Sequence, residues 1–176
     1  LVNMLAVQER SAWADEGWNH GDDPDNLRDA FKEFGGVAGG LLSAVDDVRL
    51  WGLFRHPVAQ SWFQGHVAIL GDAAHPTLPF MAQGANMALE DAWVLTESLA
   101  ASETIDSGLK RYQHQRYART VRLVEAANKN AWKYHLRAPL AWPAHQVLKL
   151  GGRFAPQKMV SQFDWIYRHD VTADPV

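Results

Sequence analysis

The residues from 67 to 92, VAILGDAAHPTLPFMAQGANMALEDA, contain the side chains whose types and spacing could carry chemistry. Four apolar residues lead into Gly71 and Asp72, and a proline-broken loop follows them. A carboxylate at the carboxyl end of a buried strand suits a ligand with neighbouring hydroxyl groups, because its oxygens accept hydrogen bonds from a ribose or ribityl diol. Asp72 is therefore a candidate binding residue, although a role as a turn or cap residue stays open on spacing alone.

A second feature is the start of a predicted helix at Gly84. The first residues of a helix have backbone N–H groups without helical acceptors, and the positive end of the helix dipole lies there. Such an end binds an anion, or a group that becomes anionic during a reaction. Gly84 would let a flat ligand approach the backbone, while Pro76 and Pro79 make the preceding loop rigid. The spacing predicts one long ligand, with a sugar-like part near Asp72 and a charge-accepting ring near Gly84.

The neighbouring titratable residues are better explained by structure than by catalysis. Histidine is a common catalytic base, so His75 could serve as one, but its place three residues after Asp72 favours a role in organising the loop. Glu90 and Asp91 point about 100° apart on a helix, so we expect helix packing and hydrogen bonding rather than a shared acid–base site. No motif of the H-E-x-x-H kind is present, and no metal site is predicted.

Composition excludes several classes of function. The chain has 176 residues, a net charge of -3 and no cysteine. A slightly acidic chain does not favour nucleic acid or an anionic membrane surface. The absence of cysteine excludes disulfides and thiolate catalysis, and it is compatible with the reducing cytoplasm, which is the location we expect. No apolar run approaches the roughly 18 residues of a membrane span.

The elements that must position these residues follow from hydrophobic periodicity. The predicted helices cover residues 27–34, 41–48, 83–101, 107–136 and 154–170, and the predicted strands cover residues 2–9, 49–54 and 67–71. Residues 17–26 and the glycine cluster 35–40 are predicted as connections, since the cluster lacks the spacing of a phosphate-binding loop. The run VAIL has the pattern of a strand buried on both faces, as in a parallel sheet.

The segment GDAAHPTLPFMAQGANMALEDA resembles the second flavin-binding motif of the single-component FAD-dependent aromatic hydroxylases, the group of salicylate and para-hydroxybenzoate hydroxylases. Weaker resemblance extends over LVNMLAVQE, RYQHQRYARTVRLV and FDWIYRHDVTA. The resemblance implies an α/β fold, the C-terminal part of a glutathione-reductase-like FAD-binding fold. Residues 1–64 would end the substrate-binding domain with strands of its antiparallel sheet, residues 65–105 would belong to the FAD-binding domain, and residues 106–176 would form a helical C-terminal region.

The resemblance also implies roles for single residues. Asp72 would bind the ribityl or ribose hydroxyls of FAD, and Pro79 would lie at the reactive edge of the flavin as the catalytic position. Backbone N–H groups near the start of the helix would face the N1–C2=O edge of the ring. The implied cofactor-binding residues are Gly71, Asp72, Pro79, Gly84, Ala85 and Asn86. Leu78, Phe80 and Met81 could line the substrate cavity or belong to the core, and the sequence favours neither.

The reaction implied by the resemblance is reduction of FAD by NADH or NADPH, addition of O₂ to give a flavin hydroperoxide, and transfer of its terminal OH to a phenolic acid. The G-x-G-x-x-G and Asp-Gly motifs of such hydroxylases are not in this sequence. We therefore expect the chain to be the C-terminal part of a longer enzyme, inactive without its N-terminal part, with a homodimer as a candidate assembly. The alternatives are another flavin-dependent oxidoreductase, epoxidase-like or halogenase-like, and a non-catalytic fragment without a complete FAD site.

Overall fold

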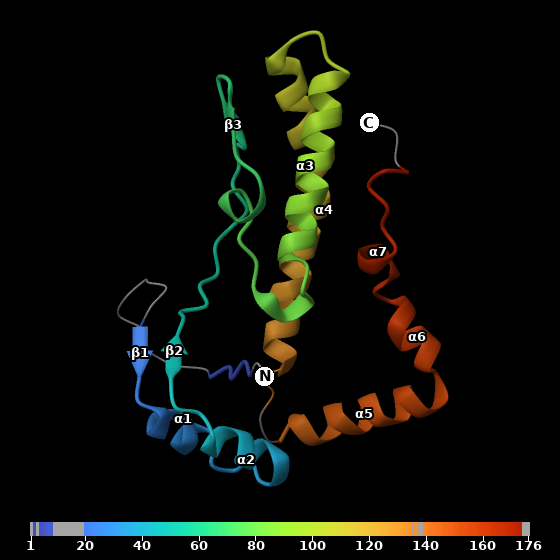
Figure 1. Cartoon of the computed structure of the whole chain (residues 1–176). Helices are drawn as coiled ribbons and strands as arrows, with labels where there is room; N and C mark the ends of the chain where they lie inside the picture. Colours follow the sequence, from blue (N-terminus) through green and yellow to red (C-terminus); the bar gives the residue numbers. More distant parts are fainter. Residues whose placement is uncertain (1, 3, 9–19, 135, 137–138, 174–176) are drawn as a thin grey trace. The chain divides into compact units, whose positions relative to one another are not determined.

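The computed structural model describes residues 2, 4–8, 20–134, 136 and 139–173. The chain divides into two compact units, Leu1–Phe54 and Arg55–Val176 (Figure 1). The predicted boundary at residue 64 concerns function rather than compactness, and it stays a prediction.

The first unit is a two-stranded sheet with two helices between its strands. Strand β1 (His20–Asp22) pairs antiparallel with β2 (Val48–Leu50), and α1 (Pro24–Ala30) and α2 (Gly36–Ser43) connect them. Asp23 caps α1, because its side chain accepts a hydrogen bond from the N–H of Asp25 at 2.9 Å.

Several predictions for this unit are wrong. The expected connection 17–26 contains β1 and the start of α1, and α1 ends before residue 34. The expected helix 41–48 ends at Ser43, and the expected strand 49–54 is the shorter β2. The glycine cluster is helical rather than a connection. A Cβ at Gly39 would lie 2.8 Å from the carbonyl oxygen of Phe34, so a close backbone approach, rather than flexibility, requires glycine there.

The predicted strand 2–9 is also not observed where the structure describes it. Residues 2 and 4–8 are not in a strand, and Val2 and Leu5 are 70% and 68% exposed. The other residues of that prediction lie outside the described residues. A strand needs a neighbouring strand, and the two sheets of the described part of the chain do not include this segment.

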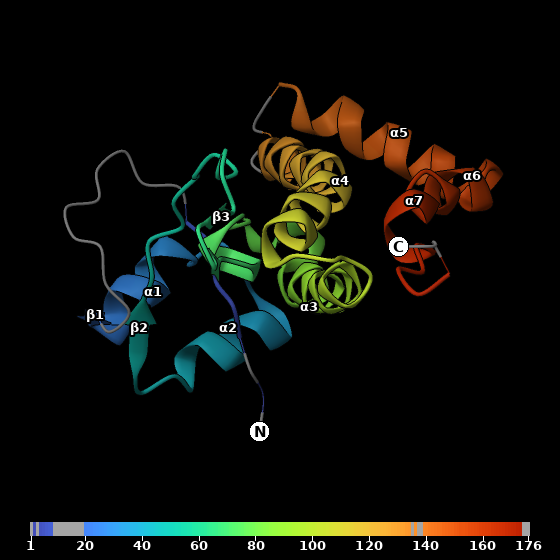
Figure 2. The ribbon, with the colours of Figure 1, turned by 90° about the horizontal axis from the view of Figure 1, so that it is seen from above.

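The second unit contains a hairpin and two long helices that lie side by side (Figures 1 and 2). Strand β3 (Phe63–Gln64) pairs antiparallel with β4 (Val67–Ala68), and α3 (Gly84–Ala100) is followed by α4 (Ile105–Tyr134). The predicted helices 83–101 and 107–136 are confirmed to within a few residues. Two 3₁₀ turns, η1 (Gly71–Ala73) and η2 (Pro79–Met81), occupy the connection between β4 and α3.

The strand predicted at residues 67–71 is shorter and differently paired. The two residues between Gln64 and Val67 include Gly65 with φ +57°, and they form a tight hairpin, which imposes antiparallel pairing. Val67 is 70% exposed. The parallel sheet inferred from VAIL is therefore not present among the described residues.

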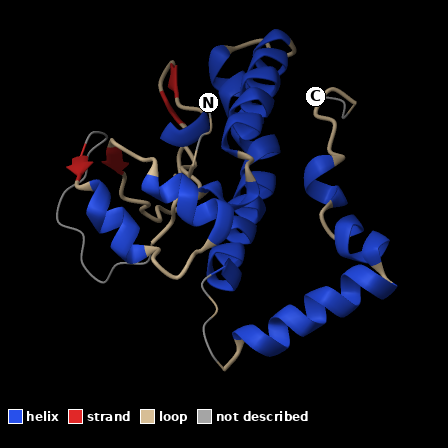
Figure 3. Cartoon of the chain, turned by 60° about the horizontal axis from the view of Figure 1, so that its bottom comes forward, coloured by secondary structure: helices blue, strands red, loops and turns tan. Residues whose placement is uncertain are grey.

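The rest of the second unit is helical (Figure 3). The helix predicted at residues 154–170 is divided, and its residues fall in α5 (Ala141–Phe154), α6 (Pro156–Ser161) and α7 (Asp164–Tyr167). Pro156 begins α6 because proline fits the first turn of a helix but not its interior. Helices with short strands agree with the predicted α/β class at this level. None of the helices in the described ranges is long and apolar enough to cross a membrane.

Two apolar clusters form the core around α3 and α4. One joins the hairpin to the helices, and the other joins η2 and the C-terminal segment to them. The first contains Trp62, Ala74, Val94 and Tyr112, and the second contains Met81, Met87, Leu123, Ala127 and Ile166. The clusters fix both ends of the connection that carries the candidate site.

Candidate functional site

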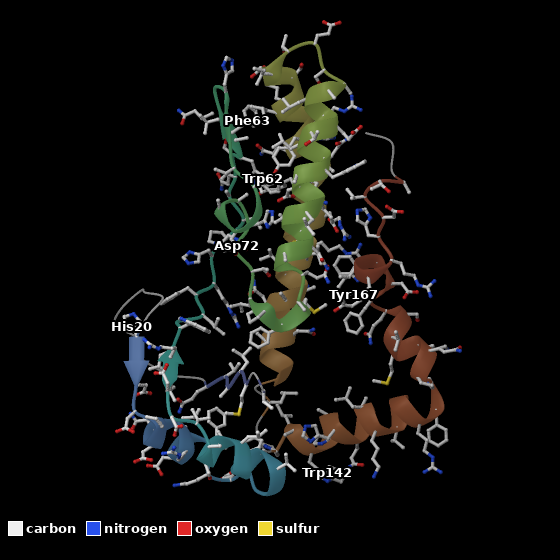
Figure 4. The ribbon with its side chains drawn as sticks, in the orientation of Figure 1. His20, Trp62, Phe63, Asp72, Trp142 and Tyr167 are labelled. Carbon is white, nitrogen blue, oxygen red and sulfur yellow. The ribbon has the colours of Figure 1, made fainter. Side chains whose placement is uncertain are left out.

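The η1 turn presents Asp72 to solvent. Gly71 is buried with φ +58°, and a Cβ there would lie 3.1 Å from the Cβ of Ala88 on α3. Both the left-handed backbone and the close approach to the helix require glycine. The carbonyl oxygen of Gly71 accepts hydrogen bonds from the N–H groups of Ala74 and His75, each at 2.9 Å. The turn is therefore held tightly, while Asp72 is exposed on it (Figure 4).

The start of α3 has no side-chain cap. Gln83 precedes the helix without capping it, and the first α-helical hydrogen bond runs from Met87 N–H to Gln83 O at 2.8 Å. The N–H groups of Gly84, Ala85 and Asn86 therefore precede the helical ladder, and Ala85 and Asn86 are exposed. This end of α3 provides donors and the positive end of the helix dipole.

The backbone just before α3 is strained. Ala82 has φ 51° and ψ 36°, a left-handed conformation that costs a residue with a Cβ about 1 kcal/mol. This residue ends η2 and turns the chain into the helix. Strain of this kind persists where surrounding packing fixes it, and Met81 on one side and Gln83 on the other are both buried.

Gly84 lies next to Asp72 in space. A Cβ at Gly84 would lie 3.9 Å from Asp72 Oδ1 and 3.5 Å from the Cγ2 atom of Thr77. Any other residue at this position would fill the space beside the carboxylate. The exposed acceptor of Asp72 and the uncapped helix start thus lie close together.

Beneath this surface, Asp91 holds a buried polar network. Its Oδ2 atom accepts a hydrogen bond from the N–H of Gly71 at 2.9 Å and lies 2.5 Å from His75 Nε2. Its Oδ1 atom accepts from Arg116 Nε at 2.8 Å. The side chains of His75 and Asp91 are fully buried. His75 therefore organises the loop, as its position in the sequence indicates, and it is not exposed as a base.

Glu90 extends the network to α4. Arg116 Nη1 lies 2.6 Å from Glu90 Oε2, and Arg119 donates to both carboxylate oxygens of Glu90 at 2.8 Å. The expectation that Glu90 and Asp91 take part in packing and hydrogen bonding is confirmed. The two carboxylates are nevertheless linked, because Arg116 is long enough to contact both of them.

The network keeps both acids ionised. Burial raises the pKa of Asp91, but hydrogen bonds from His75, Arg116 and the Gly71 N–H outweigh it and hold that pKa below its ordinary value. Burial likewise raises the pKa of Glu90, and the hydrogen bond and charge of Arg119, with those of Arg116, bring it below the ordinary value. An ionised carboxylate can only accept hydrogen bonds, so His75 Nε2 donates to Asp91, as the Gly71 N–H does.

The sequence interpretation missed the two arginines. Arg119 pairs with Glu90 and also donates to Trp165 O at 2.9 Å. Arg116 is only 2% exposed. The sequence did contain a signal for these ion pairs. Two arginines three positions apart lie on one face of a helix, and they can pair with two adjacent acids of a neighbouring helix. Lys110, by contrast, is exposed and pairs with Asp106 at 2.7 Å.

The residues between the two turns differ in burial. Pro79 is exposed at the start of η2, and Phe80 is partly buried. Leu78 is 7% exposed, and Met81 is 5% exposed within the second core cluster. A wall of the substrate cavity built from Leu78, Phe80 and Met81 stays a prediction. Within the described residues, no group of three or more metal-ligating side chains occurs.

A groove of about 340 Å³ lies elsewhere on the same unit, between α3 and the C-terminal segment. Asn86 and Glu90 are among the residues that line it, together with Tyr167 and Thr172. Asp72 is not among them. The groove therefore meets the start of α3 at Asn86 but does not include Asp72.

These features place an exposed carboxylate and uncapped backbone N–H groups side by side on one surface of the second unit. The chain belongs to the FAD binding domain family, which it matches over residues 6–127. This membership confirms the resemblance inferred from residues 71–92 and, with it, FAD as the cofactor of the family.

Curated relatives and solved structures agree with this membership. The 3-amino-4-hydroxybenzoate 2-monooxygenase PtmB3 of Streptomyces platensis is 31% identical over 170 residues, 95% of this chain and 41% of the relative. A salicylate hydroxylase of Pseudomonas putida is 29% identical over 185 residues, 99% of this chain and 41% of the relative. A salicylate hydroxylase substrate complex superposes with a TM-score of 0.75 and 27% identity, over 95% of this chain and 41% of that one. The chain spans about two fifths of the length of these relatives.

The residues of the connection between β4 and α3 fit an FAD. Asp72 supplies an exposed acceptor for hydroxyl groups, and the uncapped N–H groups supply donors for a carbonyl or an anion. The space beside Gly84, which a Cβ would fill, allows the ring of a ligand to approach the backbone. This fit concerns one end of the cofactor site, since the sequence lacks a pyrophosphate-binding G-x-G-x-x-G.

Proposed function

We propose that the protein to which this chain contributes is an FAD-dependent monooxygenase that hydroxylates an aromatic phenolic acid, using NADH or NADPH and O₂. The observation that carries the proposal is the exposed carboxylate of Asp72 beside the uncapped start of α3, in a chain of the FAD binding domain family. Relatives named for hydroxybenzoate and salicylate substrates support the substrate class. When bound, FAD supplies the redox chemistry and the activation of oxygen.

Asp72 and the start of α3 would hold opposite parts of the cofactor. The Asp72 carboxylate accepts hydrogen bonds from ribityl or ribose hydroxyls, and the Gly71 turn fixes its direction. The N–H groups of Gly84, Ala85 and Asn86 donate to the edge of the ring that gains negative charge on reduction. The helix dipole adds roughly 0.3–1 kcal/mol of stabilisation at an exposed end and up to about 2 kcal/mol at a partly buried one.

Pro79 would lie beside the reacting edge of the ring, where it has no backbone N–H to donate. Leu78, Phe80 and Met81 would supply apolar surface on the same turn. Together they would exclude water, which favours transfer of oxygen to the aromatic ring over release of peroxide.

The same proposal assigns the remaining architecture. The VAIL run would join a parallel sheet of a glutathione-reductase-like domain, whose other strands and pyrophosphate loop come from an N-terminal part of the protein. Residues 1–64 would close the substrate domain, and this chain by itself would be inactive. A need for NADH or NADPH agrees with a cytoplasmic location, and a homodimer stays a candidate assembly.

A second candidate is hydroxylation of a non-phenolic heterocycle. The observation in its favour is the likeness to Klebsiella pneumoniae HpxO complexed with FAD and uric acid, with a TM-score of 0.61 and 26% identity over 82% of this chain and 38% of that one. The two candidates share the cofactor site and differ in the substrate cavity. Epoxidase-like or halogenase-like outcomes would appear in the same product analysis.

Asp72→Ala in the full-length protein tests the cofactor role directly. Loss of a hydrogen bond to a charged acceptor, about 1.5–3 kcal/mol, should weaken FAD binding about 10- to 100-fold. Titration of the apoprotein with FAD measures it, and Asp106→Ala, which removes an exposed acid on α4, serves as the control. Unchanged affinity in Asp72→Ala would overturn the proposal.

Substrate-dependent oxidation of NADH, followed with salicylate, 3-hydroxybenzoate and uric acid, separates the two substrate classes. Hydroxylated product from a phenolic acid is the expected result. Turnover of uric acid alone would favour the second candidate, and absence of any bound flavin would contradict both.

A further inference from the structure

We propose that Asp91 is a positioning residue for the cofactor. By holding Gly71 and His75 from within the core, it fixes the turn that directs Asp72 toward FAD. This inference rests on the proposed role of Asp72. It assigns the strength of cofactor binding to a buried side chain that does not touch the ligand.

The contacts of Asp91 bracket Asp72 in the chain. One oxygen, Oδ2, takes the Gly71 N–H at 2.9 Å and His75 Nε2 at 2.5 Å, on either side of the exposed carboxylate. The turn between these two points is also closed by the hydrogen bonds to Gly71 O. With both ends of a short turn fixed, the backbone of Asp72 has little freedom to rotate.

Arg116 sets the orientation of Asp91. Its Nε donates to Oδ1 at 2.8 Å, which leaves Oδ2 for the turn. The Asp91 carboxylate is fully buried, and it accepts from the Arg116 guanidinium, the His75 ring and the backbone N–H of Gly71. Because burial makes an unpaired partner costly, the three contacts act together rather than singly.

The position next to Asp91 provides a matched control. Glu90 binds the same Arg116 and, in addition, Arg119, so it takes part in the same buried network. The ion pairs of Glu90 are with α4, whereas Asp91 also binds the N–H of Gly71 on the η1 turn. Removing the charge of Glu90 disturbs the packing of α3 on α4 without releasing the turn.

The test compares FAD affinities in the full-length apoprotein for the wild type, Asp72→Ala, Asp91→Asn, Glu90→Gln and the double variant Asp72→Ala/Asp91→Asn. We expect Asp91→Asn to weaken FAD about 10-fold or more, and Glu90→Gln about 3-fold or less at a similar loss of melting temperature. In the Asp72→Ala background, Asp91→Asn should add less than about 2-fold, because the carboxylate that it positions is gone.

A spectroscopic readout separates positioning from general destabilisation. Visible circular dichroism of the bound flavin depends on how the cofactor is held, so the Asp91→Asn spectrum should shift toward that of Asp72→Ala, and the Glu90→Gln spectrum should match the wild type. Should Asp91→Asn fail to fold, His75→Gln replaces it in the same cycle, since it removes one contact to the turn and leaves Arg116 paired.

The possible outcomes separate the positioning role of Asp91 from the FAD-binding role of Asp72. Additive effects of Asp72→Ala and Asp91→Asn, or equal losses in Asp91→Asn and Glu90→Gln, would overturn the positioning role and leave the FAD role of Asp72 intact. No effect of Asp72→Ala would instead overturn the proposed function on which the inference rests.

Discussion

At the scale of single residues, the central feature is a buried arginine between two acids. Arg116 is 2% exposed and contacts both Asp91 and Glu90, while Arg119 binds Glu90 from the next turn of α4. An arginine suits this place because its planar guanidinium can serve two carboxylates at once. The network connects the η1 turn to both long helices.

Replacing Arg116 by methionine should destabilise the protein strongly. The change leaves two carboxylates in the core without their shared cation, which typically costs about 3–5 kcal/mol. Urea denaturation followed by fluorescence measures the loss, and Lys110→Met, at an exposed pair worth at most about 1 kcal/mol, is the control. A loss below about 1 kcal/mol for Arg116→Met would contradict the importance of the network.

The lowered pKa values of Asp91 and Glu90 make stability depend on pH in a defined direction. A carboxyl group whose native pKa lies below its unfolded pKa stabilises the fold above the unfolded value, about 3.9 for Asp and about 4.3 for Glu, and loses that stabilisation as the pH falls. The unfolding free energy should therefore be level near neutrality and fall below about pH 4. Asp91→Asn should flatten this fall, and an unchanged slope would refute the assignment.

The residues that were predictable are those whose roles depend on local sequence. Asp72 follows a glycine turn and Gly84 begins a helix, and both facts are readable within a short segment. The roles of Arg116 and Arg119 were not readable in this way, because their partners lie 25 and 29 residues earlier in the chain. Only the packing of α3 against α4 brings these charges together.

At the scale of elements, the C-terminal segment supports the η2 turn. Ile166 packs in the cluster that contains Met81, and the Tyr167 hydroxyl donates to Met81 O at 3.2 Å. Arg119 holds the same segment through the carbonyl oxygen of Trp165. A turn that carries Pro79 is thus fixed by a segment nearly 90 residues later in the chain.

Tyr167→Phe should loosen η2 without unfolding the protein. It removes one hydrogen bond worth about 1 kcal/mol and keeps the ring. In the full-length enzyme the fraction of NADH oxidation that ends as hydrogen peroxide should rise by about 5-fold or less, with FAD affinity nearly unchanged. A peroxide assay measures this fraction, and Ser161→Ala on α6 is the control. Equal peroxide release in all three proteins would contradict the support of η2 by Tyr167.

The long helices were predictable and the strands were not, for one physical reason. Helices α3 and α4 satisfy their backbone groups internally, so an apolar period of about 3.6 is sufficient to locate them. A strand depends on a partner, and the pairing of Val67 with Gln64 through a tight turn could not be inferred from the apolar run alone. The glycine cluster was predicted as a connection although it is helical. Glycine is required at Gly39 by a close backbone approach, and the sequence alone does not distinguish that requirement from flexibility.

At the scale of the whole molecule, the apolar strand edge of the hairpin is unusual. Val67 is 70% exposed and Leu70 is 38% exposed, although both belong to the run VAIL, whose composition fits a fully buried strand. An exposed apolar edge favours pairing with another strand. In the proposed enzyme, that strand comes from the N-terminal part of the FAD-binding domain.

Val67→Asp in the full-length protein tests this arrangement. If a neighbouring strand and helix cover residue 67, a buried charge there should lower the free energy of unfolding by at least about 2–3 kcal/mol. The loss combines the burial free energy of the valine side chain with the cost of an unpaired buried polar group. His66→Asp is the control, because His66 is exposed and lies in the turn, outside both strands of the hairpin. Its effect should stay within about 0.5 kcal/mol. Thermal unfolding and FAD content of the two variants measure the difference. Equal stability of both would mean that the hairpin edge stays in water, and the parallel sheet would then have to be assigned elsewhere in the protein.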